Sequence, residues 1–137
     1  MLLHEEQTYN ILGACFEVYR EKGCGYLEAV YQECLGIEFA RKGIPFTAHP
    51  EMRLSYKGQS LNTVYVADFI CYDVILLELK AVSTLASEHR AQVMNYLKGT
   101  GIELALLVNF EHHPKLEHER IIVKKLSLAN HHKEEED

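Results

Sequence analysis

Apolar residues in the first third of the chain recur at the three- and four-residue steps of amphipathic helices. One such stretch predicts a helix from about His4 to Lys22, after which Gly23 interrupts the pattern. A second stretch predicts a helix from about Tyr26 to Lys42, ended by Gly43. The chain is therefore expected to begin with two helices.

After Pro50 the pattern changes to the two-residue alternation and β-branched content of strands. The expected strands are Met52–Tyr56, Leu61–Cys71 and Val74–Val82, joined by turns at Lys57–Gln59 and around Tyr72. The third is apolar except at Glu78 and Lys80, which is typical of a strand buried on both faces in the centre of a sheet.

One more helix and two more strands complete the pattern, at Ser87–Lys98, Ile102–Phe110 and Arg120–Leu126. The order α-α-β-β-β-α-β-β predicts an α/β fold, with a central mixed sheet of four to five strands flanked by helices. Three consecutive strands can form an antiparallel meander, and the later helix can cross over to a parallel neighbour. We expect one domain over residues 1–128 and a disordered acidic tail over 129–137.

Composition agrees with a globular chain. Its 137 residues suffice for one domain, with 47% hydrophobic and 25% charged residues. No apolar run approaches the roughly 20 residues of a membrane span, and no secretory signal pattern opens the chain. The four cysteines contain no Cys-x-x-Cys pair, so we expect reduced thiols and a cytoplasmic location.

The net charge of −6 counts against a tight, sequence-independent DNA-binding protein, which is normally basic. Bound divalent cations would offset this charge locally. A polar loop holds His112, His113 and His118, but their spacing is poor for a compact zinc site, and a solvated loop is the expected reading.

Glu78 and Lys80 carry the strongest chemical signal. Alternation along the strand directs both side chains to the same face. Buried ionisable groups are costly unless they are paired or bind a metal. The alternatives are a salt bridge across the sheet or an edge strand with one wet face.

Asp68 lies in the preceding strand and comes close to Glu78 if the two strands pair through the turn at Tyr72. A strand-end aspartate that caps the turn is the alternative. A carboxylate pair suits Mg²⁺, which would polarise a phosphoryl oxygen and lower the pKa of a bound water. Lys80 can orient that water or stabilise the charge that develops on the phosphate.

An aspartate followed by Glu-x-Lys on a hairpin, as at Asp68 and Glu78–Lys80, resembles the PD-(D/E)XK nuclease superfamily. Residues Gly25–Tyr31 match the Gly-x-x-Glu-x-x-Tyr pattern of its GxxExxY protein family, and Gln92–Tyr96 match the Gln-x-x-x-Tyr helix of RecB-type nucleases. The resemblance spans nearly the whole chain and implies a restriction-endonuclease-like fold. Ala67 departs from the pattern, which often has proline there.

The catalytic positions that the resemblance implies are Glu28, Asp68, Glu78, Lys80, Gln92 and Tyr96. It makes Glu28, Asp68 and Glu78 the ligands of Mg²⁺, with Mn²⁺ as a substitute. Other readings remain for three of them: Glu28 as a first-turn residue favoured by the helix dipole, Gln92 as a surface position and Tyr96 as a core aromatic.

The expected function is therefore a Mg²⁺-dependent nuclease that cuts phosphodiester bonds of nucleic acid, DNA more than RNA. A non-catalytic binding or assembly subunit with a nuclease fold is one alternative, and another metal-dependent phosphohydrolase is a second. A homodimer is plausible because a small domain offers little surface to hold a long polymer. No membrane partner is expected.

Overall fold

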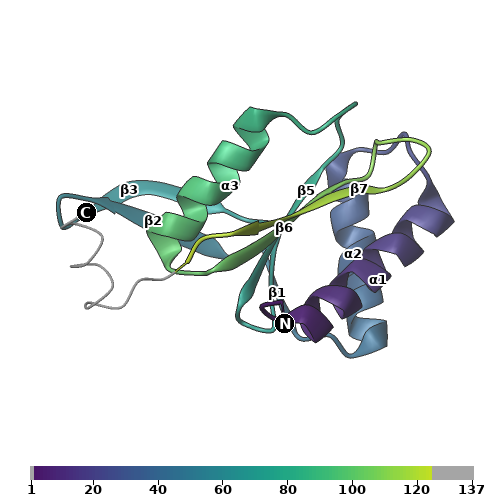
Figure 1. Cartoon of the computed structure of the whole chain (residues 1–137), viewed down its shortest axis with the longest axis horizontal. Helices are drawn as coiled ribbons and strands as arrows, with labels where there is room; N and C mark the ends of the chain where they lie inside the picture. Colours follow the sequence, from purple (N-terminus) through teal and green to yellow (C-terminus); the bar gives the residue numbers. More distant parts are fainter. Residues whose placement is uncertain (1, 125–137) are drawn as a thin grey trace.

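A computed structural model describes residues 2–124 of the chain (Figure 1). Its helices are α1 Glu5–Lys22, α2 Glu28–Lys42 and α3 Ser87–Thr100. Its strands are β1 Phe46–Ala48, β2 Glu51–Tyr56, β3 Gln59–Val66, β4 Phe69–Cys71, β5 Ile75–Lys80, β6 Leu104–Asn109 and β7 Glu117–Ile122. The expected acidic tail over 129–137 and the end of the last expected strand lie outside the described residues. None of the described helices is long and apolar enough to cross a membrane.

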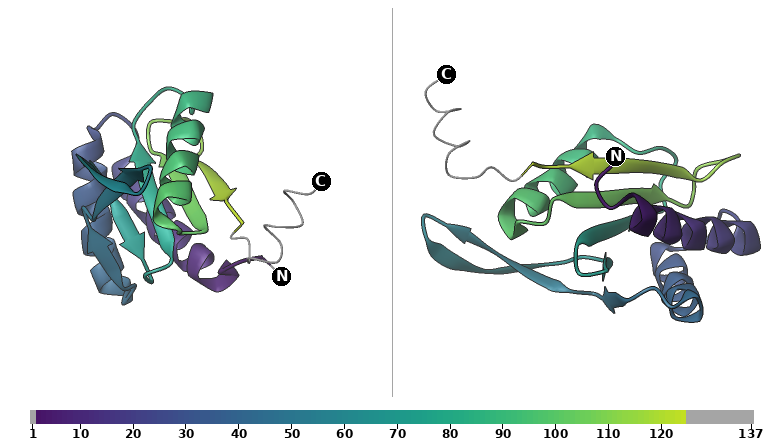
Figure 2. Two further views of the ribbon diagram at one scale, coloured as in Figure 1. Left: turned by 90° about the vertical axis from the view of Figure 1, so that its left-hand side faces the viewer. Right: turned by 60° about the horizontal axis from the view of Figure 1, so that its bottom comes forward.

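Five strands form the central sheet in the order β1-β4-β5-β6-β7. Strands β5 and β6 are parallel and the other neighbours are antiparallel, so the sheet is mixed. Helices α1 and α2 cover one face, while α3 and the β2–β3 hairpin lie over the other (Figures 1 and 2). The predicted α/β fold, a restriction-endonuclease-like mixed sheet flanked by helices, is confirmed.

Strand β5 lies at the centre of this sheet, and its side chains divide between two apolar cores. Ile75, Leu77 and Leu79 pack with α1 and α2. Leu76 packs with α3 and the hairpin, and alternation directs Glu78 to the same side. The expected burial on both faces is thus observed, and the strand ends at the half-buried Lys80.

The expected strand Leu61–Cys71 is divided in two. Its first part, β3, pairs with β2 in a separate two-stranded sheet, and its second part, β4, pairs with β5 in the central sheet. The chain changes sheet at Ala67, whose N–H donates to the Pro50 carbonyl. A continuous apolar pattern does not reveal such a transfer, so the expected three-stranded meander is wrong. Strand β1 was not expected because three residues are too few to show a periodicity.

Candidate metal centre at the end of strand β5

Asp68 and Glu78 meet where β4 begins, because Phe69 lies opposite Leu77 in the β4–β5 pair. The Asp68 N–H donates to Glu78 Oε1 at 3.0 Å, and the Leu79 N–H donates to Asp68 Oδ2 at 2.9 Å. Each carboxylate is therefore held by a backbone N–H of the opposite segment.

Both carboxylates resist ionisation in this position. Burial, with the negative charge of Asp68 adding to it, raises the pKa of Glu78 to about 7. Burial likewise raises the pKa of Asp68, opposed by the Leu79 N–H and by the positive charge of Lys80. Two neighbouring acids with raised pKa values are an arrangement that a bound cation would stabilise.

Glu28 approaches the same place from the first turn of α2. Much of its side chain is exposed, yet partial burial of its carboxyl raises its pKa. The positive charge of Lys80 lowers that pKa and the negative charge of Asp68 raises it, so both groups lie within electrostatic range. Lys80 itself is half-buried, two residues beyond Glu78 on the same face of β5.

A cleft of about 540 Å³ opens beside these groups. Its lining residues are Glu28, Ala29, Gln32, Glu33, His49 and Asp68. The His49 N–H donates to the Asp68 carbonyl at 2.9 Å, and Gln32 Nε2 donates to the same oxygen at 3.4 Å. Neither residue was expected at the site. For His49 the reason is that it directly follows β1, a strand that no sequence pattern predicts.

The geometry of the turn before α2 explains the Gly-x-x-Glu-x-x-Tyr spacing of Gly25, Glu28 and Tyr31. Gly25 adopts φ +105°, a conformation that favours glycine, and its N–H donates to Glu111 Oε2 at 2.9 Å. The fully buried Tyr31 hydroxyl donates to the Gly23 carbonyl at 2.6 Å and accepts from the Tyr26 N–H at 3.3 Å. Tyr31 is thus a core residue that pins the turn, and Glu28 follows the turn at the cleft.

The sequence profile of the PD-(D/E)XK nuclease superfamily matches residues 5–121. The chain belongs to this superfamily. Among solved structures, the crystal structure of SSO0001 superposes with a TM-score of 0.51 and 22% sequence identity, covering 75% of this chain and 54% of that one. The chain thus spans about half the length of that protein, and the likeness is one of fold. No curated protein matches the chain.

PD-(D/E)XK nucleases generally use divalent metal ions, and the donor set fits one in part. Asp68 and Glu78 supply neighbouring carboxylate oxygens, the ligands that hard cations prefer. Within residues 2–124, however, no three histidine, cysteine, aspartate or glutamate side chains stand in a metal-binding arrangement. The exposed Glu28 side chain would therefore have to turn toward the pair to complete a three-carboxylate shell.

Neither alternative for Glu78 and Lys80 is realised in this PD-(D/E)XK domain: β5 is a central strand and not an edge strand, and neither residue forms a salt bridge across the sheet within residues 2–124. Over the described part of the chain, the ion pairs join Arg20 to Glu17 and Arg90 to Glu119. The alternative for Asp68, a cap on the turn at Tyr72, is not realised either, because its carboxylate accepts from the Leu79 N–H at the end of the β4–β5 pair away from that turn.

Helix α3 contributes Tyr96 to the flank of the site but leaves Gln92 exposed. The Tyr96 ring stacks on Tyr65 of β3, with ring centroids 3.3 Å apart and planes 5° apart. The Tyr65 hydroxyl is buried and makes no hydrogen bond of normal geometry within residues 2–124, yet it lies near enough to lower the pKa of Glu78. Sequence reasoning missed Tyr65, because only the folding of the hairpin over α3 brings it to the site.

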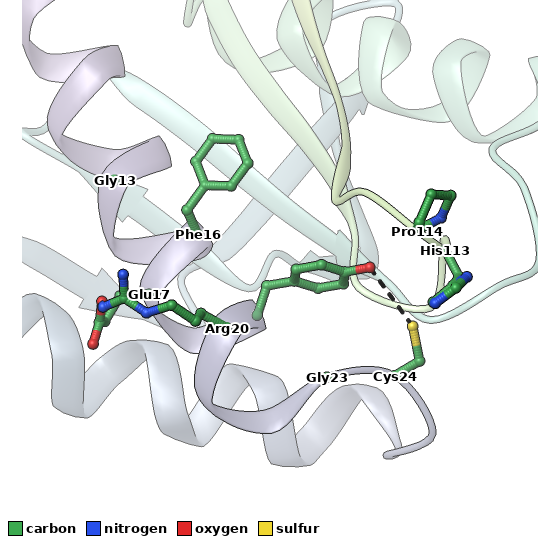
Figure 3. A pocket seen from close by; sticks show the side chains of 9 residues that line it. Gly13, Phe16, Glu17, Arg20, Gly23, Cys24, His113 and Pro114 are labelled. Atoms are coloured by element: carbon green, nitrogen blue, oxygen red, sulfur yellow. Dashed lines mark hydrogen bonds and ion pairs between the residues drawn. The ribbon is translucent and has the colours of Figure 1, made fainter.

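A second cavity, of about 610 Å³, lies between α1 and the loop before β7 (Figure 3). Its lining includes Phe16, Tyr19, Arg20, Gly23, Cys24 and His113. It is larger than the acidic cleft but contains none of the expected catalytic residues. Gly23 and Cys24 line this cavity, whereas Glu28, at the start of α2, lines the cleft.

Proposed function

We propose that this chain is a divalent-cation-dependent nuclease of the GxxExxY group, hydrolysing phosphodiester bonds of nucleic acid, DNA rather than RNA. One observation carries the proposal: the buried Glu78 and the partly buried Asp68 form a carboxylate pair at the end of the central strand. Two adjacent acids that resist ionisation do not stabilise a fold. Their cost in folding stability therefore indicates a functional site.

Asp68 and Glu78 would hold the cation, with Glu28 joining from α2. The cation is expected to be Mg²⁺, with Mn²⁺ as a substitute, because all the donors are carboxylate oxygens. When bound, it would supply a Lewis acid for the phosphoryl oxygen and a lowered pKa for its water.

The chain's own residues orient the substrate and stabilise charge. Lys80, on the same face of β5 as Glu78, would stabilise the negative charge that develops on the phosphate, or orient the attacking water. Backbone N–H groups fix the carboxylates before substrate arrives, which reduces reorganisation during the reaction. Gln92 and Tyr96 would line the substrate side from α3.

Domain organisation, location and oligomeric state concern the whole molecule. We propose a single domain over residues 1–128 and a cytoplasmic location, with which four free thiols are consistent. A homodimer is retained as the means of holding a long substrate, and light scattering after size-exclusion chromatography measures it directly.

The test is cleavage of labelled DNA and RNA with Mg²⁺, Mn²⁺ or EDTA. Lys80→Ala and Asp68→Ala are expected to abolish metal-dependent cleavage while the protein stays folded. Lys115→Ala and Asp73→Asn are the controls, because both residues lie away from the cleft and asparagine tolerates the positive φ of Asp73. Cleavage that persists in both site variants would refute the proposal.

Calorimetric titration with Mg²⁺ and Mn²⁺ separates the nuclease from a non-catalytic binding subunit. The nuclease is expected to bind metal at millimolar concentration or below, and Glu78→Gln is expected to weaken that binding. No heat of binding at millimolar metal would favour the non-catalytic subunit. Phosphate release from small phosphoesters without cleavage of nucleic acid would favour another phosphohydrolase.

A further inference from the structure

His49 adopts a backbone conformation that few residues other than glycine adopt. It directly follows β1 with φ +53°, in the left-handed region, which costs free energy unless the surrounding structure holds the residue there. Two hydrogen bonds do so. The His49 N–H donates to the Asp68 carbonyl at 2.9 Å, and the carbonyl of the next residue, Pro50, accepts from the Ala67 N–H at 3.1 Å. His49 is therefore fixed between the central sheet and the hairpin.

This position brings the His49 side chain to the acidic cleft. Ala48 lies opposite Phe69 in the β1–β4 pair, and one step further in the same register His49 lies opposite Asp68. The exposed His49 lines the cleft of about 540 Å³ together with Glu28 and Asp68. The charge of His49 lowers the pKa of Asp68, as expected of an imidazole near that carboxyl group.

The cleft borders the carboxylate pair on its Asp68 side, because its lining set contains neither Glu78 nor Lys80. A phosphate in the cleft would therefore be a neighbour of the scissile phosphate, which the proposed mechanism assigns to the cation and Lys80. Phosphate contacts of this kind fix the register of a strand without reading its sequence.

Most polar groups of the cleft are unsuited to a phosphate. Glu28, Glu33 and Asp68 have acidic side chains, which repel it when ionised. The lining side chains with N–H groups belong to Gln32 and His49. Gln32 Nε2 already donates to the Asp68 carbonyl at 3.4 Å. This leaves the His49 imidazole as the principal side-chain donor that a ligand in the cleft can meet.

We propose that the His49 imidazole donates a hydrogen bond to the phosphate next to the scissile one, and so positions the nucleic acid against the carboxylate pair. This inference rests on the proposed nuclease function and adds a substrate contact to it. His49 is a positioning residue in this role, since the reacting atoms lie at the neighbouring phosphate.

A purely structural role for His49 is the competing explanation. The bend requires a residue that tolerates positive φ, and glycine does so best. His49→Gly therefore keeps the backbone conformation and removes the imidazole. His4→Gly is a matched control, because His4 also has positive φ, 51°, and does not line the cleft. Circular dichroism checks folding, and His49→Asn, which also tolerates positive φ and ends short of the imidazole Nε2, repeats each measurement.

Fluorescence anisotropy tests binding apart from cleavage. The probe is a labelled mixed-sequence DNA, in single-stranded and duplex form, with Ca²⁺ in place of Mg²⁺ to prevent turnover. His49→Gly is expected to raise the Kd of the tighter-bound form about fivefold or more, because it removes a hydrogen bond to a charged group. His4→Gly is expected to leave the Kd unchanged. Equal Kd values for the two variants would overturn the proposal.

Methylphosphonate interference tests the contact with the phosphate itself. A methylphosphonate, which carries a methyl group in place of a charged oxygen, is placed at a fixed position in the labelled DNA, and the products of Mg²⁺-dependent cleavage are mapped. Wild type is expected to lose cleavage at the modified linkage and at one neighbouring bond, where the modified group would meet His49. His49→Gly is expected to cleave that neighbouring bond as it does in unmodified DNA. The same suppression in both proteins would refute the contact.

Metal titration separates this role from metal ligation, since an imidazole nitrogen can also bind a metal ion. His49→Gly is expected to bind Mg²⁺ and Mn²⁺ in calorimetry with the affinity of wild type. A weakened affinity would make His49 a metal ligand and overturn the phosphate assignment.

The two proposals fail separately. A wild-type protein that never cleaves, but whose binding of DNA depends on His49, would reject the nuclease and keep the phosphate site. Cleavage that is unchanged in His49→Gly would keep the nuclease and reject the phosphate site.

Discussion

The two faces of strand β5 differ in what they contribute. Ile75, Leu77 and Leu79 face α1 and α2, where they pack in the larger apolar core and are almost fully buried. Leu76 and Glu78 face α3 and the hairpin, a smaller core that ends in polar groups. Leu77 and Glu78 are adjacent in the chain, yet Leu77 lies in an apolar environment and Glu78 in one that accommodates a carboxylate.

This difference shows where a fold can accommodate a buried acid. A carboxylate survives at position 78 because the Asp68 N–H, Lys80 and Tyr65 all lie near it. One residue earlier, Leu77 is fully buried in the apolar core beneath α1 and α2. The first face stabilises the sheet, and that stability offsets the cost of acids on the second.

Moving the acid by one residue is the strongest test of this contrast. Leu77→Glu would bury a carboxylate beneath α1 and α2 and is expected to lower the free energy of unfolding by at least about 4 kcal/mol. Urea denaturation measures it, with Val74→Glu, a partly exposed position, as a control expected to cost less than about 0.5 kcal/mol. If Leu77→Glu does not fold, Leu77→Ala is expected to lose about 3 kcal/mol. A cost below about 1 kcal/mol for both would contradict the contrast.

Neutralising the native acid is expected to act in the opposite direction. The pKa of Glu78 rises from 4.5 to about 7 on folding, so between these pH values the folded state keeps a proton that the unfolded state has lost. Stability therefore falls as pH increases through this window, by about 3 kcal/mol in total at about 1.4 kcal/mol per unit. In EDTA, Glu78→Gln is expected to be more stable than wild type by up to about that amount at pH 8.

The control for this pH effect is Glu51→Gln, an exposed carboxylate on β2. Its difference from wild type is expected to stay flat from pH 5 to pH 8. Added Mg²⁺ should stabilise wild type but not Glu78→Gln, because a ligand of the native state raises its stability. A Glu78→Gln variant that is less stable than wild type at pH 8 would contradict the raised pKa.

The same contrast explains which parts of the molecule were predictable. Glu78 and Lys80 stand out because polar residues interrupt an apolar strand, and two-residue alternation alone puts them on one face. Asp68 could be placed near them because a short turn fixes the β4–β5 pairing. The fold class followed from helical and strand periodicities that are long and regular.

What the sequence could not predict depends on contacts between distant segments. Tyr65 lies in the same apolar run as Phe69, yet the chain changes sheet between them, so their environments differ. His49 reaches Asp68 through a three-residue strand that has no periodic signal. Gln92 has the spacing expected of a site residue, but it remains exposed on α3.

Asn109 binds the loop that follows the polar end of β5. Replacing Asn109 tests whether these hydrogen bonds contribute to the stability of the fold. Asn109 is fully buried: Oδ1 accepts from the Val82 N–H at 3.0 Å, and Nδ2 donates to the Val82 carbonyl at 2.8 Å and to Glu117 at 2.9 Å. Asn109→Ala would leave buried polar groups without partners and is expected to cost about 2 kcal/mol. Asn95→Ala on the exposed side of α3 is the control, and equal losses in the two variants would reject this role.

The smallest expected effect comes from one hydroxyl group. The Tyr65 hydroxyl lowers the pKa of Glu78, so Tyr65→Phe is expected to raise that pKa further. A double-mutant cycle with Glu78→Gln at pH 8 isolates the coupling, expected to be about 0.5–1 kcal/mol. Tyr96→Phe keeps the ring that stacks on Tyr65 and is expected to show no coupling to Glu78. A coupling near zero for Tyr65 would mean that the Asp68 N–H and Lys80 alone stabilise the carboxylate at position 78. The difference between the two faces of β5 would then come from the groups at the end of the strand and not from the hairpin.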